Sequence, residues 1–427
     1  FLYGGNDKYR LSQEIILGIG GIRMLEKLNY KNIKKYHMNE GHSSLLAIEL
    51  LRQSKRNNIN KYDIEDIKKK CIFTTHTPVP AAHDQFSYEL VKKLLDNFIS
   101  TELLKKLGGK KRLNMTLLAL NLSNYINGVA KQHSKISKGL FPNYPIDSIT
   151  NGVHSPSWIC KSFKELYDKY IPGWIHDPFS LRYAVSIPKE EIWDAHKKAK
   201  SLLIDYIGKY INDNESDKLD HQVFTIGFAR RAAAYKRADL VFNNKEKIIN
   251  IAKYIGKIQF VFSGKAHPQD YQGKSLIKKI INLSKELKNE IKIVYLENYN
   301  IDLAKMLVSG VDLWLNTPQK PNEASGTSGM KAAHNGIPSL SILDGWWIEG
   351  CIEGFTGWSI GSAKNEVSQD ADDANSLYLK LENEILPVFY NNQDKWIDIM
   401  RYTIAINASF FNTHRMVQQY ITNAYAF

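Results

Sequence analysis

The stretch "VDLWLNTPQKPNEASGTSGMKAAHNGIPSLSILDGWW", residues 311–347, carries the pattern that decides the fold. A short apolar run is followed by a loop rich in Gly, Ser and Thr, then by a helix start, and then by a second apolar run. Apolar runs of this length with turn residues on either side are typical of buried strands. A strand, a helix and another strand in succession form the unit from which parallel sheets are built.

The same alternation extends over most of the chain. Helical periodicity separates the apolar runs, for example at residues 44–53, 87–99 and 275–288. The other runs that we interpret as strands are residues 34–40, 71–77, 222–229, 257–264 and 291–298. The sequence therefore predicts an α/β fold with parallel sheets.

The length of 427 residues is sufficient for two domains. The Gly- and Pro-rich residues 139–159 are the best candidate for a boundary, because few regular elements are expected there. We expect a first domain at 1–150, a second at 151–395, and a helical tail at 396–427 that packs back toward the first. The chain starts with Phe1 and without a signal peptide, so we expect it to begin inside a longer protein.

Composition narrows the functional class. No stretch approaches 18 uncharged apolar residues, so we expect no membrane association. Cys71, Cys160 and Cys351 are far apart and lack CxxC spacing, which favours a reducing compartment, the cytoplasm, and argues against zinc. The net charge is +13, but the lysines are scattered, so we expect no nucleic-acid partner. A basic surface still suits anionic small substrates.

Cations gather after two of the expected strands. Residues 222–229 run into "RRAAAYKRADL", where four cations lie at a strand end and an expected helix start: Arg230, Arg231, Lys236 and Arg237. Lys265 follows the next strand. Guanidinium and ammonium groups in such places can bind phosphate, whereas the alternative is a basic helix face that meets solvent. Two successive strand ends with cations favour the phosphate site.

Lys331, at the end of the Gly- and Ser-rich loop, could be a phosphate clamp, a covalent anchor or an ordinary lysine of a first helical turn. The loop has neither Walker A nor GxGxxG spacing. A lysine in a crowded, cation-rich pocket has a depressed pKa and can form an imine with an aldehyde. Pyridoxal phosphate is the commonest cofactor of this type.

The first half of the chain offers further candidates. His37 and His42 are five residues apart, with Glu40 between them, which suits neither one helical face nor HExxH, so we expect no metal. His76 follows a strand and precedes prolines that hold the loop extended, as in a ligand-facing backbone, although a core or surface histidine is the alternative.

Asn127 and Gly128 end a helical pattern, and we interpret the pair as a simple helix C-cap.

These segments, in this order, resemble the α-glucan phosphorylases of the glycogen and maltodextrin phosphorylase family over nearly the whole chain. The motifs that carry the resemblance are "MNEGHSSL", "THTPVPAAHD", "NGVAKQHS", "RRAAAYKR", "SGKAHP", "LENYNIDLA" and "EASGTSGMK" followed by "NG" and "LDG". "LYGGND", "GIGGIRML" and "ILDGWWIEG" are more similar to the bacterial and archaeal branch than to the animal enzymes.

The resemblance implies a fold and a reaction. The fold is the GT-B type, two Rossmann-like domains that face each other across a cleft, with the first incomplete because the family's amino-terminal portion is absent. The reaction is reversible, retaining phosphorolysis of an α-1,4-glucan such as glycogen, starch or maltodextrin by inorganic phosphate to α-glucose 1-phosphate. Pyridoxal 5'-phosphate is the implied cofactor, and its phosphate group takes part in catalysis. A homodimer is a further expectation, while allosteric control stays open.

The resemblance also implies roles for individual residues, which we carry over by matching motifs. Lys331 matches the lysine that holds the cofactor. The residues that match the surroundings of the cofactor are Lys265, Tyr299 and Thr327, and those that match the phosphate site are Arg231 and Lys236, with Arg230 beside them. The positions that hold glucose hydroxyls are matched by Glu323, Ser325 and Gly326, and a sugar-binding asparagine is matched by Asn127. His42 and Glu40 match a loop beside the glucan cleft, and His76 matches a histidine whose backbone carbonyl faces the anomeric carbon.

Electrostatics favours this assignment. Two phosphates that exchange a proton each carry about 1.5 to 2 negative charges at neutral pH. At ~5 Å and an effective dielectric of ~20 they repel by about 7 kcal/mol or more. We expect Arg230, Arg231, Lys236 and Lys265 to offset this repulsion. No pair of protein carboxylates of the glycosidase type is then required.

Two alternatives stay open. A sugar-nucleotide-dependent glucan synthase shares the architecture but does not need Lys331. A glucan-binding remnant would bind maltodextrin without turnover. This alternative stays open because, in the family, the absent amino-terminal portion supplies a glycine-rich loop near the glucose. The chain also departs from the family at Arg230, where lysine is common, at Glu40, where aspartate is common, and at Asn300, where the animal enzymes have arginine.

Overall fold

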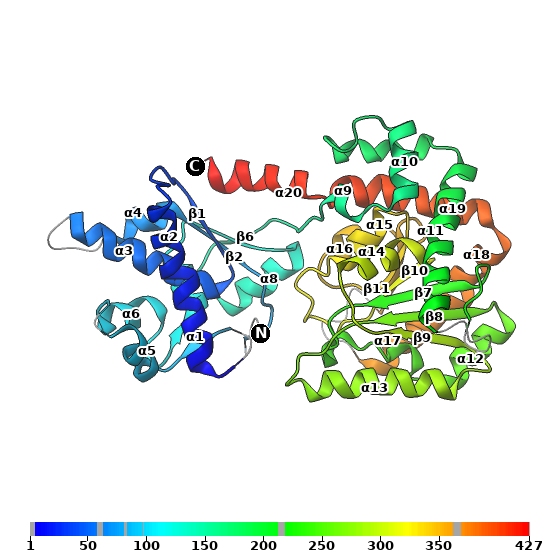
Figure 1. Ribbon diagram of the computed structural model, residues 1–427, viewed down its shortest axis with the longest axis horizontal. Helices are drawn as coiled ribbons and strands as arrows, with labels where there is room; N and C mark the ends of the chain where they lie inside the picture. The colour runs from blue at the N-terminus through cyan, green and yellow to red at the C-terminus, as the bar shows by residue number, and fades with distance from the viewer. Residues whose placement is uncertain are drawn as a thin grey trace. The chain divides into compact units, whose positions relative to one another are not determined.

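The computed structural model describes residues 5–57, 63–80, 83–96, 98–211, 218–361 and 369–426. They divide into two compact units (Figure 1). The first unit comprises Phe1–Thr150 and Gln419–Phe427, and the second comprises Asn151–Gln418. The segment that groups with the first unit is thus shorter than the tail expected at 396–427.

The first unit is built on a four-stranded parallel sheet with the order β1-β2-β5-β6. Its strands are β1 (Tyr36–Asn39), β2 (Cys71–Thr75), β5 (Tyr125–Gly128) and β6 (Ile146–Ser148). A short antiparallel pair, β3 (Gln85–Phe86) and β4 (Leu113–Asn114), lies apart from it. The helices are α1 (Asp7–Ile15), α2 (Gly21–Lys27), α3 (Leu45–Asn57), α4 (Ile64–Lys70), α5 (Tyr88–Leu95), α6 (Thr101–Gly108), α7 (Met115–Asn121) and α8 (Lys131–Leu140).

One face of this sheet is apolar and the other is polar. Met38, Phe73 and Ile126 alternate inward and belong to the core of the unit. On the opposite face, His37 and Asn127 contact the terminal segment. Nδ1 of His37 lies 2.7 Å from the Tyr425 hydroxyl, and Nδ2 of Asn127 donates to the Tyr420 hydroxyl at 3.1 Å. The terminal residues therefore cover polar groups that the strands present.

The second unit is built on a six-stranded parallel sheet with the order β12-β11-β10-β7-β8-β9. Its strands are β7 (Phe224–Ala229), β8 (Ile258–Ser263), β9 (Lys292–Leu296), β10 (Leu313–Asn316), β11 (Ser339–Ile342) and β12 (Gly357–Ile360). All six residues of β7 and all six of β8 are buried, which explains why most of them are apolar. The polar exceptions are Thr225, Gln259 and Ser263.

Helices pack on both faces of this sheet (Figure 1). The helices of the second unit are α9 (Ser155–Trp158), α10 (Lys161–Tyr170), α11 (Lys189–Tyr210), α12 (Lys245–Tyr254), α13 (Tyr271–Glu286), α14 (Ile301–Gly310), α15 (Ser328–Ala333), α16 (Trp347–Gly350), α17 (Asp370–Lys380), α18 (Leu386–Asn391), α19 (Gln393–Tyr402) and α20 (Thr413–Tyr420), whose end passes into the terminal segment of the first unit. Phe260 belongs to a core cluster that also contains residues of α12, α13, α17 and α19, whereas its neighbour Val261 belongs to a second cluster with residues of α11 and α14. The mixed α/β fold with parallel sheets is confirmed.

Two local expectations were wrong. Asn127 and Gly128 do not cap a helix but end strand β5, because they pair with β2 on one side and β6 on the other. Residues 230–240 do not begin an α-helix. One 3₁₀ turn lies at Ala234–Lys236 and a second at Leu240–Phe242, and α12 starts at Lys245. The backbone of Arg237 takes a left-handed conformation there, with φ of 45°.

Within the described ranges, no helix combines the length and the apolar character that a membrane span requires. Across the same residues, no group of three or more His, Cys, Asp or Glu side chains is placed to hold a metal ion.

Candidate functional site

The strand order of the second unit places the candidate residues at a point of reversal. From β7 the chain continues to β8 and β9 on one side, and then β10 pairs with the other side of β7. Ligands of open parallel sheets bind outside the carboxyl ends of strands at such a reversal. Arg230 directly follows β7, and the loop that contains Glu323 follows β10.

Arg230, Lys236 and Glu323 form a compact ion cluster at this point. Oε2 of Glu323 accepts hydrogen bonds from NH2 of Arg230 and from Nζ of Lys236, each at 2.5 Å. The three side chains are 11%, 7% and 11% exposed for Arg230, Lys236 and Glu323. The sequence-predicted phosphate and sugar residues are thus brought into direct contact.

The charges of this cluster shift the ionisation of its members. Burial opposes the ionisation of Glu323, but the charges of Arg230 and Lys236 outweigh it and hold the pKa of the carboxyl below its usual range. Burial and then the charge of Arg230 lower the pKa of Lys236 to about 7, although Glu323 acts in the opposite direction. Lys236 therefore titrates close to neutral pH.

Arg230 is held by a residue that the sequence did not indicate. Oδ1 of Asn316, the last residue of β10, accepts a hydrogen bond from NH1 of Arg230 at 3.1 Å. Among the buried polar atoms of the described residues, Nε of Arg230 and Oγ of Ser325 lack a hydrogen-bond partner. Buried polar groups without partners are uncommon, and they are typical of sites that receive a ligand.

The loop after β10 is fixed through its backbone. The amide of Glu323 donates to Oδ2 of Asp344 at 2.9 Å, and the amide of Gly345 donates to Oδ1 of the same side chain at 2.9 Å. Burial raises the pKa of Asp344 to about 6, against the effect of these two amides. Gly326 has φ of 81°, and a Cβ there would lie 3.2 Å from Cγ of Glu323, so this position requires glycine.

Lys331 lies in α15, and its amide donates to the carbonyl of Thr327, which immediately precedes the helix, at 3.2 Å. Its ammonium lies 3.8 Å from the centre of the Trp158 ring. Burial lowers the pKa of Lys331, and within the described ranges no ion pair with a carboxylate counteracts this shift. Trp158 was missed because it lies in the boundary segment, far from Lys331 in the sequence.

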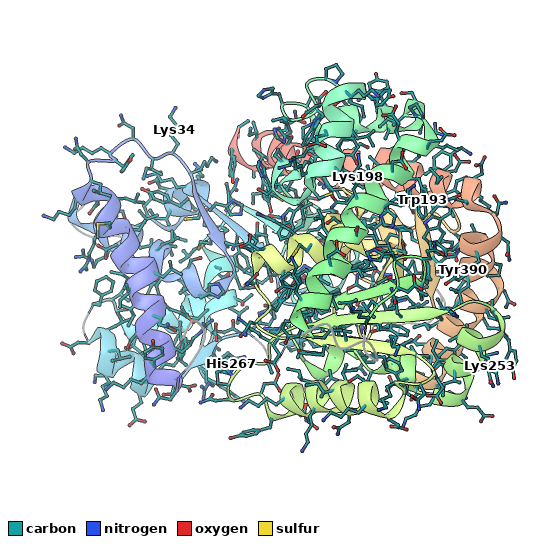
Figure 2. The ribbon with its side chains drawn as sticks, turned by 45° about the vertical axis from the view of Figure 1, so that its right-hand side comes forward. Lys34, Trp193, Lys198, Lys253, His267 and Tyr390 are labelled. Carbon is teal, nitrogen blue, oxygen red and sulfur yellow. The ribbon has the colours of Figure 1, made fainter. Side chains whose placement is uncertain are left out.

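The remaining predicted residues of the second unit occupy different settings. Arg231 and Lys265 are exposed. Lys265 lies in the loop after β8, to which the labelled His267 also belongs (Figure 2). The carbonyl of Lys265 accepts a hydrogen bond from the amide of Ala232 at 3.0 Å, which connects this loop to the one after β7. Tyr299 is partly buried, and burial raises its pKa while the charge of Arg230 opposes the shift.

Arg237, which the sequence grouped with the other cations, is used elsewhere. Its guanidinium donates to Oδ1 of Asp370 at 2.8 Å and to Oδ2 of Asp373 at 2.7 Å. It also donates to the carbonyls of Thr317 and Pro318. These contacts fix the loop after β10 to α17. The ion cluster with Glu323 therefore contains Arg230 and Lys236 but not Arg237.

In the first unit, Glu40 organises the loop around His76. Oε1 of Glu40 accepts from the amide of Gly41 at 2.9 Å, and Oε2 accepts from the amide of His76 at 2.6 Å and from Oγ1 of Thr77 at 2.8 Å. The side chain of His76 is hydrogen bonded to Asn39. Glu40 therefore fixes the backbone of His76.

His42 and Asn127 also lie in the first unit, in separate networks. Nδ1 of His42 lies 3.5 Å from NH2 of Arg10, which also pairs with Asp84. Asn127 is fully buried, and its Oδ1 accepts a hydrogen bond from Oγ1 of Thr74 at 2.8 Å. Its amide is therefore engaged within the unit.

Comparison with known proteins identifies the family. Residues 96–357 match the family model described as carbohydrate phosphorylase. The chain belongs to the carbohydrate phosphorylase family. The expected relationship to the bacterial and archaeal branch of the phosphorylases is confirmed.

Individual phosphorylases match the whole of this chain. It is 39% identical to a maltodextrin phosphorylase from Thermococcus litoralis, of which it covers 55%. It is 35% identical to a glycogen phosphorylase from Aquifex aeolicus, of which it covers 67%, and 31% identical to one from Mycobacterium tuberculosis, of which it covers 55%. The chain thus spans about half to two thirds of the length of these relatives.

Proposed function

We propose that this chain carries the phosphate- and cofactor-binding site of an enzyme that cleaves α-1,4-glucan with inorganic phosphate and releases α-glucose 1-phosphate. The observation that carries the proposal is the contact of Arg230 and Lys236 with Glu323 at the reversal point of the second sheet. Membership of the carbohydrate phosphorylases supports it, as do the relatives named for maltodextrin and glycogen. The GT-B arrangement across a cleft, a cytoplasmic location and a homodimer are parts of the same proposal.

The two cations of the ion cluster can bind inorganic phosphate as a reactant. Arg230 and Lys236 offer charged donors in a nearly water-free place, where such donors bind phosphate oxygens strongly. Arg231, which the motif match assigns to the substrate phosphate, is exposed in this structure, as is Lys265. Both would attract the anion over a longer range, and Arg231 would then bind it together with Lys236.

The residues around Lys331 fit pyridoxal phosphate. The pKa of Lys331 is lowered, its ammonium has an aromatic neighbour in place of a carboxylate, and small residues surround it in the loop that begins at Glu323. An amine of this kind is more often in the neutral form that attacks an aldehyde. Lys265, Tyr299 and Thr327 would complete the binding of the cofactor.

We infer that the chain's residues orient the reactants. When bound, pyridoxal phosphate supplies a phosphate group that exchanges a proton with the substrate phosphate. Arg230 and Lys236 hold the substrate phosphate so that it can protonate the glycosidic oxygen and then attack the sugar from the same face, which retains configuration. Glu323, Ser325 and Gly326 hold glucose hydroxyls, and the backbone carbonyl of His76 stabilises the positive charge at the anomeric carbon.

Asn127, His42 and Glu40 would contribute to the binding of the glucan. Two of these residues already have hydrogen-bond partners within the protein. Asn127 is engaged with Thr74 and Tyr420, and the carboxylate of Glu40 is engaged with three donors. Both residues would therefore act through the groups that they position, unless substrate displaces those groups.

A glycosidase mechanism is disfavoured by the carboxylates of the site. It requires one carboxylic acid that is protonated near neutral pH. The pKa of Glu323 is held low by two cations, so its carboxyl stays ionised near neutral pH. Burial raises the pKa of Asp344 to about 6, but each of its oxygens accepts a backbone amide of its own unit, which engages the carboxyl in holding the loop.

The experiment that tests the proposal compares two reaction mixtures, each with the wild-type protein and with one variant. The protein, loaded with pyridoxal phosphate, is incubated with maltodextrin and inorganic phosphate, and in parallel with maltodextrin and a nucleoside-diphosphate glucose. We expect glucose 1-phosphate in the first mixture and no chain extension in the second. Lys331→Ala should lower the rate by at least about 100-fold. Chain extension that survives Lys331→Ala would favour a synthase, and maltodextrin binding without either product would favour a glucan-binding remnant.

A further inference from the structure

The carboxylate of Glu323 occupies the position in which an anion would meet the two buried cations. Its Oε2 is the shared acceptor of Arg230 and Lys236, with each donor at 2.5 Å. A bound phosphate oxygen would take the same place, because a carboxylate and a phosphate accept hydrogen bonds from guanidinium and ammonium in the same way. The carboxylate of Glu323 thus occupies the place of an anion that would bind to Arg230 and Lys236.

The cluster offers more donors than Glu323 uses. Both contacts fall on one carboxylate oxygen, while Nε of Arg230 is buried without a hydrogen-bond partner. A phosphate dianion has a second charge and further acceptor oxygens, so it can satisfy donors that the carboxylate leaves unused. Exchange of the carboxylate for phosphate is therefore favourable.

The proposed function gives the same carboxylate a second task, the binding of glucose hydroxyls. While Oε2 accepts from the two cations, it is a weak acceptor for a neutral hydroxyl, and the carboxylate offers the sugar at most its Oε1. After the carboxylate has left the cations, both oxygens can accept from glucose hydroxyls. The two tasks therefore compete for Oε2.

The backbone of Glu323 and the guanidinium of Arg230 each have a hydrogen bond that does not depend on the carboxylate. The amide of Glu323 donates to Asp344 at 2.9 Å, and NH1 of Arg230 donates to Asn316 at 3.1 Å. Arg230 and the loop therefore keep these contacts when the carboxylate leaves.

We propose that Glu323 is an internal occupant of the anion-binding site, which inorganic phosphate displaces, and that the displaced carboxylate then binds the sugar. The proposal rests on the proposed function and adds a binding order to it. Phosphate and sugar bind with positive cooperativity, and by linkage each raises the affinity for the other by the same factor.

The test measures binding of inorganic phosphate by isothermal titration calorimetry to the wild-type protein and to Glu323→Gln. The substitution keeps the shape and removes the competing charge, so phosphate should bind at least about 5- to 10-fold more tightly, within the usual range of coupling factors. Glu286→Gln is the matched control. Glu286 pairs with Lys245 at 2.6 Å on the surface of the same unit, and its loss should change the affinity by less than about 2-fold.

A second titration separates exchange from simple repulsion between Glu323 and phosphate. Maltotriose is titrated with and without saturating sulfate, which does not react. In the wild type, sulfate should raise the affinity for maltotriose at least about 5-fold. In Glu323→Gln, the affinity should be the same with and without sulfate.

The outcomes distinguish this inference from the proposed function. Phosphate that binds Glu323→Gln no more tightly than Glu286→Gln, or sulfate that leaves the wild-type affinity for maltotriose unchanged, overturns the exchange while the reaction can stand. Absence of phosphate binding to both the wild type and Glu323→Gln contradicts the proposed function, and the exchange with it. The main expected result is a gain of affinity, which loss of folding cannot produce.

Discussion

The ammonium of Lys331 lies 3.8 Å from the centre of the Trp158 ring, and the side chain of Asn335 joins the two residues through their backbones. Nδ2 of Asn335 donates to the carbonyl of Trp158 at 2.9 Å and to the carbonyl of Lys331 at 3.1 Å. The lysine is thus held against an aromatic surface in a partly buried place. This arrangement keeps it out of ion pairs with carboxylates in the part of the chain that the structure describes.

The first prediction concerns the reactivity of Lys331. Because burial lowers its pKa below the ordinary value of 10.5, the neutral amine is available at lower pH than in a surface lysine. Covalent trapping with pyridoxal phosphate and borohydride, measured over a pH series by peptide mapping, should reach half of its maximum at Lys331 below pH 10.5. The exposed Lys198 of α11, which has no role in the proposed site, serves as the reference in the same digests. A midpoint for Lys331 at or above 10.5 would contradict the account.

The second prediction concerns the charge of Lys236. Burial and the charge of Arg230 lower its pKa to about 7, so the ammonium is present below that pH and is lost above it. Binding of sulfate, whose charge is constant near neutral pH, should weaken as pH rises from about 7, by up to about tenfold per unit. Lys236→Arg keeps its charge at all these values, and its sulfate affinity should stay flat. Equal pH profiles for the two proteins would rule out this role of Lys236.

The third prediction concerns Glu40 as the residue that positions His76. Its carboxylate accepts three hydrogen bonds, from Gly41, His76 and Thr77, whereas glutamine has a single acceptor oxygen. Glu40→Gln should therefore displace the His76 backbone and lower kcat about 10- to 100-fold, with a change in KM for glucan of less than about 3-fold.

Thr77→Val is the matched variant for this prediction. It removes one donor to Glu40 and leaves both amide contacts, so kcat should fall by less than about 3-fold. A rise in KM at unchanged kcat in Glu40→Gln would mean that Glu40 binds substrate directly.

The fourth prediction concerns stability at the opposite end of the second sheet. Asp312 is fully buried and pairs with Nζ of Lys200 at 2.6 Å and Nε2 of His196 at 2.8 Å. Burial opposes its ionisation, but the charge of Lys200 and the contact with His196 hold its pKa below the usual range. Asp312→Ala leaves a buried ammonium unpaired, so urea unfolding should show a loss of about 3–5 kcal/mol.

Glu286→Gln is again the control for this measurement, because the pair with Lys245 is exposed and should contribute less than about 1 kcal/mol. Equal losses for the two variants would show that the buried pair contributes no more than a surface pair.

Much of the second unit could be predicted from the sequence, since its strands are buried on both faces. Residues 258–263 have four apolar side chains among six and show no polar face of helical period, which is typical of a strand buried on both faces. Asn127 and Gly128 were misinterpreted for the opposite reason. Local chemistry favours a turn at this pair, and pairing with two distant strands overrides it.

The candidate site was predictable as a set of residues but not as an arrangement. Motifs located Arg230, Lys236 and Glu323, yet their mutual contact depends on β10 pairing with β7, which no local pattern encodes. In the sequence, Arg237 could not be distinguished from the neighbouring cations. In the structure, it pairs with carboxylates of α17, which are far away in the sequence. Trp158 contacts Lys331 across the fold from a segment without a recognisable motif.

The identity of the product is the decisive test of phosphorolysis by this protein. Phosphorus-31 NMR can follow the reaction of the protein, loaded with pyridoxal phosphate, in a mixture of maltodextrin and inorganic phosphate. We expect the signal of inorganic phosphate to decline while that of α-glucose 1-phosphate grows, and we expect Lys331→Ala to abolish this change. Glucose released without a phosphate ester, or a phosphate ester that forms equally with Lys331→Ala, would contradict this expectation.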